Sequence, residues 1–118
     1  MKTVLVLGAS PNPERYSYLA VKRLLARGHH VIAVGKRPGS IDSVVIQKDW
    51  PEVHPDTITM YLGAPNQTEY YDLILHSGAR RIIFNPGAEN PELAALAREN
   101  GIATEEACTL VMLSTGTF

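Results

Sequence analysis

Short apolar runs that end at glycine or proline alternate with longer amphipathic stretches along this chain, and the alternation restricts the folds it can adopt. The first run, Val4-Leu5-Val6-Leu7, is closed by Gly8, a pattern typical of a strand that is buried on both faces. Residues 16–27 follow with apolar side chains at three- and four-residue spacing, which predicts a helix. Strands and helices that alternate in this way favour a parallel sheet with helices on both faces.

Further apolar runs extend the same pattern to the end of the chain. They predict strands at residues 31–34, 57–62 and 82–84 and from residue 102 onward, with residues 44–46 as a candidate short strand. We therefore expect an α/β fold: a single doubly wound, Rossmann-like domain over residues 1–118 with a mostly parallel five-stranded sheet.

Two further helices are indicated by their start signals. Asn90-Pro91-Glu92 is the clearest start, because an Asn cap precedes a proline at the first helical position. Asn66 followed by Glu69 indicates another helix, which would end near residue 77. The apolar segment at residues 109–113 is of undecided type.

The charge balance excludes one large class of partners. Eleven Lys and Arg residues nearly cancel twelve Asp and Glu residues, so no overall positive field exists to hold nucleic acid. An anionic ligand would need a local cluster of cations. The single cysteine excludes a disulfide framework, and with the four histidines it forms no zinc-site spacing, so no metal is expected. The absence of a secretion signal and of about 18 consecutive apolar residues favours a cytoplasmic protein outside the membrane.

The turn after the first strand has the position of a phosphate-binding turn, directly after a buried strand and before a helix. Its sequence is Gly8-Ala9-Ser10-Pro11-Asn12-Pro13. Gly8 can make the tight turn, and the small Ser10 still lets backbone amides approach a phosphate while adding a hydroxyl donor. Pro13 replaces the third glycine of the dinucleotide motif, which suggests a longer loop and a later helix start.

The end of the second strand discriminates between nucleotides. NAD-binding sheets usually carry a carboxylate there, which accepts hydrogen bonds from the ribose 2′-hydroxyl. This chain has Gly35-Lys36-Arg37 instead, with no carboxylate before Asp42. Two cations suit a phosphorylated ribose, either NADP with its 2′-phosphate or coenzyme A with its 3′-phosphate. The same charges would also fit a solvated loop, but beside the Gly8 turn we favour the phosphate interpretation.

Three stretches carry a resemblance when they are taken together. They are Gly-Ala-Ser-Pro-Asn-Pro-Glu-Arg at residues 8–15 with Ser17-Tyr18, Ile-Ile-Phe-Asn-Pro-Gly at residues 82–87 followed by Glu92, Ala95, Ala97 and Gly101, and Glu106-Ala107-Cys108. In this order they resemble the single-domain CoA-binding protein family, which is related to the N-terminal domain of the succinyl-CoA synthetase α-subunit. The resemblance spans nearly the whole chain and implies a Rossmann-like domain that binds CoA at the strand ends.

The resemblance also implies which residues line that site. Arg15 would reach a phosphate, and Ser17 and Tyr18 would begin the first helix. The other implied positions are Gly8, Ala9, Ser10 and Pro11 in the first turn, Gly35, Lys36 and Arg37 in the adenine-ribose loop, Ala64 and Pro65 after the third strand, and Asn85, Pro86 and Gly87 after the fourth.

Groups that could carry out chemistry are sparse. Cys108 could face the CoA sulfur, although a lone cysteine beside the apolar residues 110–113 is more typical of a small buried side chain. None of the histidines has an acid or thiol partner in the sequence. The CoA ligases related by resemblance use a histidine in a further domain, which a chain of 118 residues does not contain. We therefore expect binding of CoA or an acyl-CoA without a complete catalytic site, rather than an enzyme.

Two alternatives stay open. A small NADP-binding oxidoreductase or nicotinamide nucleotide sensor would use the same turn and cations, but the Tyr-x-x-x-Lys spacing occurs only at Tyr18 and Lys22, in the first helix. Alternatively, the fold could have lost its ligand and serve as a regulatory or protein-interaction subunit. A protein partner or a homo-oligomer is compatible with each of these hypotheses.

Overall fold

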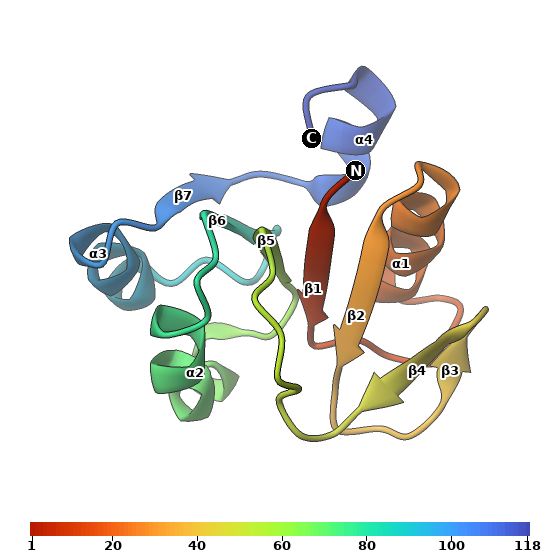
Figure 1. The fold of residues 1–118 in the computed structure, drawn as a ribbon, viewed down its shortest axis with the longest axis horizontal. Coiled ribbons are helices and arrows are strands. Elements are labelled where there is room, and N and C mark those ends of the chain that lie inside the picture. The colour runs from red at the N-terminus through yellow and green to blue at the C-terminus, as the bar shows by residue number, and fades with distance from the viewer.

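One sheet of seven strands runs through the computed structural model, which describes residues 1–118 (Figure 1). In sheet order the strands are β3 (Ser40–Ile41), β4 (Val44–Gln47), β2 (His30–Val34), β1 (Thr3–Leu7), β5 (Thr57–Met60), β6 (Arg81–Phe84) and β7 (Ala103–Glu106). All neighbouring strands are parallel except β3 and β4, which are antiparallel. The prediction of an α/β fold with a mostly parallel sheet is confirmed.

The expectation of five strands is wrong, because β3 and β4 add two strands beyond β2. The candidate short strand at residues 44–46 is β4, whose Ile46 pairs with Ala33 of β2. β3 pairs antiparallel with β4 across a turn in which Asp42 adopts a positive φ of 52°. β3 has only two residues, which are too few to produce the alternation that identifies a strand in a sequence.

Four α-helices accompany the sheet: α1 (Tyr16–Ala26), α2 (Tyr71–Leu75), α3 (Pro91–Glu99) and α4 (Thr109–Thr115). α3 begins as predicted, since the backbone N–H of Leu93 donates to Asn90 Oδ1 at 3.2 Å. The helix expected over residues 66–77 is instead divided into the 3₁₀ turns η1 (Ala64–Asn66) and η2 (Thr68–Tyr70) followed by α2. Gln67 explains the division: its fully buried amide donates to the carbonyl oxygens of Leu62 and Ala88, at 2.7 and 2.8 Å.

The helices cover both faces of the sheet, α2 and α3 on one face and α1 and α4 on the other (Figure 1). Alternate side chains of β1 point to opposite faces. Leu5 lies in the apolar cluster that contains Leu93 of α3, and Val6 lies in the cluster that contains Leu24 of α1. This double coverage is the physical reason for the unbroken apolar run in β1. None of the helices is both long enough and apolar enough to cross a membrane.

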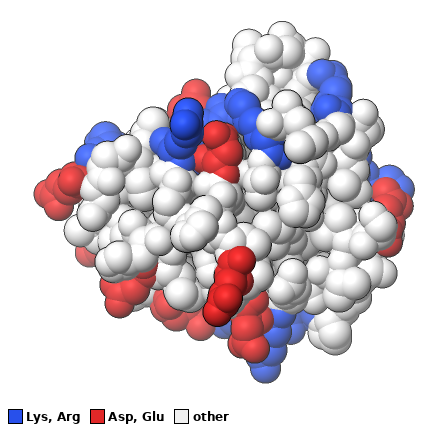
Figure 2. Space-filling view, viewed as in Figure 1, with Lys and Arg blue, Asp and Glu red and all other residues white.

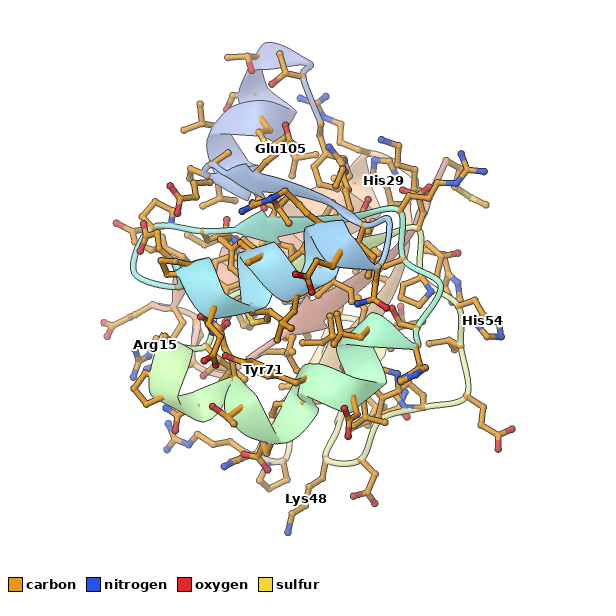
Figure 3. All side chains as sticks on the ribbon, turned by 90° about the vertical axis from the view of Figure 1, so that its left-hand side faces the viewer. Arg15, His29, Lys48, His54, Tyr71 and Glu105 are labelled. Atoms are coloured by element: carbon orange, nitrogen blue, oxygen red, sulfur yellow. The ribbon has the colours of Figure 1, made fainter.

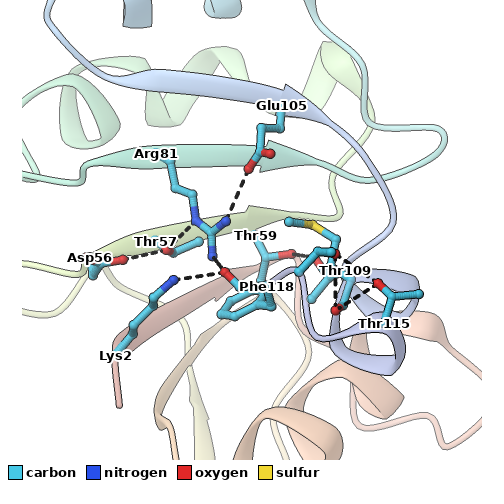
Figure 4. A network of polar contacts seen from close by, with 11 residues as sticks. Lys2, Asp56, Thr57, Thr59, Arg81, Glu105, Thr109, Thr115 and Phe118 are labelled. Carbon is cyan, nitrogen blue, oxygen red and sulfur yellow. Dashed lines mark hydrogen bonds and ion pairs between the residues drawn. The ribbon is translucent and has the colours of Figure 1, made fainter.

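A buried polar network joins the sheet to α4. Asn85 follows β6 and donates from Nδ2 to Thr59 Oγ1 at 2.7 Å and to the carbonyl oxygen of Met60 at 2.9 Å. Its Oδ1 accepts from the backbone N–H of Thr109 at 2.8 Å. The hydroxyls of Thr59 and Thr109 lie 2.7 Å apart (Figure 4). One side chain thereby links β5, β6 and the start of α4.

Candidate binding site at the carboxyl edge of the sheet

The parallel strands end in register at one edge of the sheet. Leu7 of β1 pairs with Val34 of β2 and with Met60 of β5, and Met60 pairs with Phe84 of β6. The direction of strand addition reverses at β1, because β2 lies on one side of it and β5 on the other. Open parallel sheets bind ligands in the crevice beyond the carboxyl ends at such a reversal. A cavity of about 650 Å³ opens at this place.

The cavity brings together many of the residues that the sequence implicated. Those that line it are Gly8, Ala9, Ser10, Arg15, Ser17, Lys36, Arg37 and Pro86. Those that do not line it are Pro11, Tyr18, Gly35, Ala64, Pro65, Asn85 and Gly87. Asn85 is committed to the network below α4. Tyr18 packs against the α1 face of the sheet, with Lys22 Nζ 5.9 Å from its ring centroid.

The structure adds wall residues that the sequence analysis missed. These are Glu14, Tyr16, Tyr61, Leu62, Gly63 and Asn66. Residues 61–63 directly follow β5 at the reversal of strand order, so the rule for parallel sheets could have identified them. Tyr16 is 72% exposed at the start of α1, and no sequence signal distinguishes it from a helix-surface residue.

The backbone donors of the first turn are arranged differently from the expectation. Gly8 adopts a φ of +95°, and its N–H and that of Ala9 both donate to the carbonyl oxygen of Val34, at 2.8 and 3.0 Å. These two amides therefore hold β1 to β2 and do not face a ligand. The next residue, Ser10, has an N–H without a partner in the protein. Its Oγ accepts from the N–H of Asn12 at 3.2 Å, which leaves the hydroxyl proton free to donate.

The first turn of α1 presents more donors to the same cavity. The backbone N–H groups of Tyr16 and Ser17 have no partner within the protein, because first-turn amides cannot bond inside their own helix. Arg15 occupies the N-cap position without a side-chain cap, and the first turn contains no acidic residue. The Arg15 guanidinium takes part in no ion pair. This end of α1 combines the positive end of the helix dipole with an uncommitted cation, which favours an anionic ligand.

The turn after β2 supplies two more cations. Lys36 Nζ lies 2.9 Å from Glu69 Oε1 of η2, and this hydrogen bond together with the Glu69 charge raises the pKa of Lys36. Arg37 forms no ion pair. The three cations of this cavity form a local cluster, whereas acidic and basic side chains are intermixed on the face drawn in Figure 2.

Gly35 sets the spacing between the two turns. A Cβ at this position would lie 2.2 Å from the carbonyl oxygen of Ala9, a backbone atom that cannot move away freely. We expect Gly35→Ala to lower the free energy of unfolding by about 1–3 kcal/mol, as overpacking does in a closely packed interior. Gly63→Ala is the matched control, because its Cβ would find no atom closer than the Pro65 Cδ at 3.9 Å. Urea denaturation compares the two variants, and equal stability would contradict the contact between the turns.

The wall contains few groups suited to acid–base chemistry. The Tyr61 hydroxyl is buried without a hydrogen-bond partner, and burial raises the pKa of Tyr61 to about 12. Cys108 is partly buried and does not line the cavity. His54 lines a second cavity of about 600 Å³, and in Figure 3 it lies on the opposite side of the molecule from Arg15. No group of three or more His, Cys, Asp or Glu side chains is placed to hold a metal ion. The arrangement is suited to hold a polyanion.

Comparisons with known proteins agree with this geometry. The family model described as "CoA binding domain" matches residues 2–114. A solved structure of an uncharacterized protein is 46% identical, with a TM-score of 0.97 over 100% of this chain and 98% of that one. A hypothetical protein from Pyrococcus horikoshii OT3 is 21% identical, with a TM-score of 0.86 over 95% of this chain and 81% of that one. The Thermus thermophilus protein called cell-free ID.343 is 19% identical, with a TM-score of 0.83 over 99% and 90%. The last two share the fold alone.

Proposed function

This chain belongs to the CoA-binding domain family, and from this premise we propose that it binds CoA or an acyl-CoA in the cavity at the carboxyl edge. Residues 1–118 would form one Rossmann-like domain. The order of the six parallel strands, β4-β2-β1-β5-β6-β7, supports this assignment, because it is the order of a doubly wound dinucleotide-binding sheet.

The observation that carries the proposal is the convergence of uncommitted donors on one cavity. The N–H groups of Ser10, Tyr16 and Ser17 and the guanidinium of Arg15 suit the diphosphate of CoA. Arg37 and Lys36 lie at the β2 side of the same cavity and suit the 3′-phosphate. CoA carries both anionic groups, so it matches both ends of the cluster.

The remaining wall supports an orientation for the ligand. Tyr61, Leu62 and Pro86 line the cavity on the β5 and β6 side, away from the turn that follows β2. The less polar pantetheine arm would follow this side. A volume of about 650 Å³ is in the range of small-molecule sites. We assign the protein a binding role without a catalytic residue of its own.

A thermal-shift series with CoA, 3′-dephospho-CoA, NADP and NAD tests this function. At a hundredfold excess over its Kd, a ligand of the folded state adds about 2.7 kcal/mol of stability. We expect the largest rise in Tm with CoA, a smaller one with 3′-dephospho-CoA and the least with NAD. No shift with CoA would contradict the proposal, and a larger shift with NADP than with CoA would favour the nicotinamide alternative.

A further inference from the structure

We propose, building on the CoA-binding function above, that Glu69 competes with the 3′-phosphate of the ligand for the Lys36 ammonium. Glu69 would thereby lower the affinity of the site specifically for nucleotides that carry a phosphate monoester. It is a specificity-determining residue that lies outside the cavity wall.

The geometry places this competitor beside the site. Lys36 follows β2 and lines the cavity, whereas Glu69 belongs to η2, which follows β5. Because β1 lies between β2 and β5 in the sheet, the 2.9 Å contact between Nζ and Oε1 links the two sides of the crevice. The side chains are 61% and 55% exposed, so a ligand can reach the pair from solvent.

The pairing singles out Lys36 among the cations of the wall. Arg15 and Arg37 have no carboxylate partner, whereas Glu69 holds the Lys36 ammonium by a hydrogen bond and by its charge. An anionic ligand finds the two arginines available at once. It can use Lys36 only by displacing Glu69.

The chemistry of the ligand decides whether that displacement occurs. A phosphate monoester carries close to two negative charges at neutral pH and three acceptor oxygens, whereas a carboxylate carries one charge. Exposed ion pairs are weak, so a monoester can replace Glu69, but a neutral ribose hydroxyl cannot. The displaced Glu69 carboxylate would then remain close to the phosphate and repel it. Both effects oppose binding of CoA more than binding of 3′-dephospho-CoA.

The sign of the effect separates competition from positioning. If Glu69 held Lys36 in a binding geometry, removal of the carboxylate would weaken CoA binding. If Glu69 competes, its removal tightens CoA binding. Glu69→Gln keeps the size and hydrogen-bonding capacity of the side chain while it removes the charge.

Calorimetric titration of the full chain with CoA and with 3′-dephospho-CoA tests the competition. We expect E69Q to bind CoA about two- to fivefold more tightly, the range set by exposed ion pairs. Its affinity for 3′-dephospho-CoA should change by less, and the gain for CoA should shrink when E69Q is combined with K36Q. Glu99→Gln, at the exposed end of α3, makes the same charge change away from the cavity and should leave both affinities unchanged.

The outcomes distinguish this inference from the function on which it rests. A weaker or unchanged affinity of E69Q for CoA, or an equal gain for both nucleotides, overturns the role of Glu69 while CoA binding stands. If the unsubstituted protein binds no CoA, the proposed function fails and the competition fails with it.

Discussion

Arg37→Gln is expected to weaken CoA binding by about ten- to thirtyfold and to leave the affinity for 3′-dephospho-CoA nearly unchanged. The reason is that Arg37 is the cation on the β2 side of the cavity that no carboxylate holds. A charge-assisted hydrogen bond from guanidinium to phosphate contributes more than a neutral one, and a ligand without the 3′-phosphate cannot form it. The selectivity between the two nucleotides should therefore fall with the affinity for CoA.

Titration calorimetry at a single salt concentration measures this change. Arg27→Gln is the matched control, because Arg27 is an exposed arginine at the C-cap of α1 and does not line the cavity. It should bind both nucleotides like the unsubstituted protein. An equal loss for CoA and 3′-dephospho-CoA in the Arg37 variant would show that Arg37 attracts anions in general and does not read the monoester.

The largest expected loss of stability comes from Asn85→Ala, which should lower the free energy of unfolding by about 3 kcal/mol. Asn85 is 2% exposed, and its amide serves Thr59, the Met60 carbonyl and the Thr109 N–H. Alanine removes all three bonds, leaves buried backbone groups without partners and creates a cavity. Because Thr109 begins α4, the docking of this helix should weaken as well.

Urea denaturation with circular dichroism measures the loss in Asn85→Ala. The control is Asn100→Ala, since Asn100 is exposed and its side chain bonds only the Leu96 carbonyl within the end of α3. We expect the control to lose less than about 1 kcal/mol. If Asn85→Ala were as stable as the control, Asn85 would not be the link between the sheet and α4.

Local signals predicted the elements whose residues are governed by local or repeating physics. β1 and β2 are recognisable because both of their faces are buried, and the start of α3 because an Asn cap and a proline act within one turn. The expected helix over residues 66–77 failed for a non-local reason. Gln67 bonds the Ala88 carbonyl, a contact that sequence periodicity does not reveal.

The site was predictable to the same extent. Parallel topology brings every turn that follows a strand to one edge, so the Gly8 turn and the Lys36-Arg37 turn could be placed together from the sequence. The assignment of the turn amides could not, because the Val34 carbonyl takes those of Gly8 and Ala9 only in the folded sheet. The contact of Lys36 with Glu69 likewise depends on where η2 settles after the chain turns at Gln67.

The most direct test of the account is a structure of the protein determined with CoA bound. We expect the diphosphate within hydrogen-bond reach of the Ser10 and Ser17 amides and of Arg15, with the 3′-phosphate beside Arg37 on the β2 side of the cavity. CoA bound instead in the second cavity, beside His54, or with its phosphates directed away from the start of α1, would contradict the account.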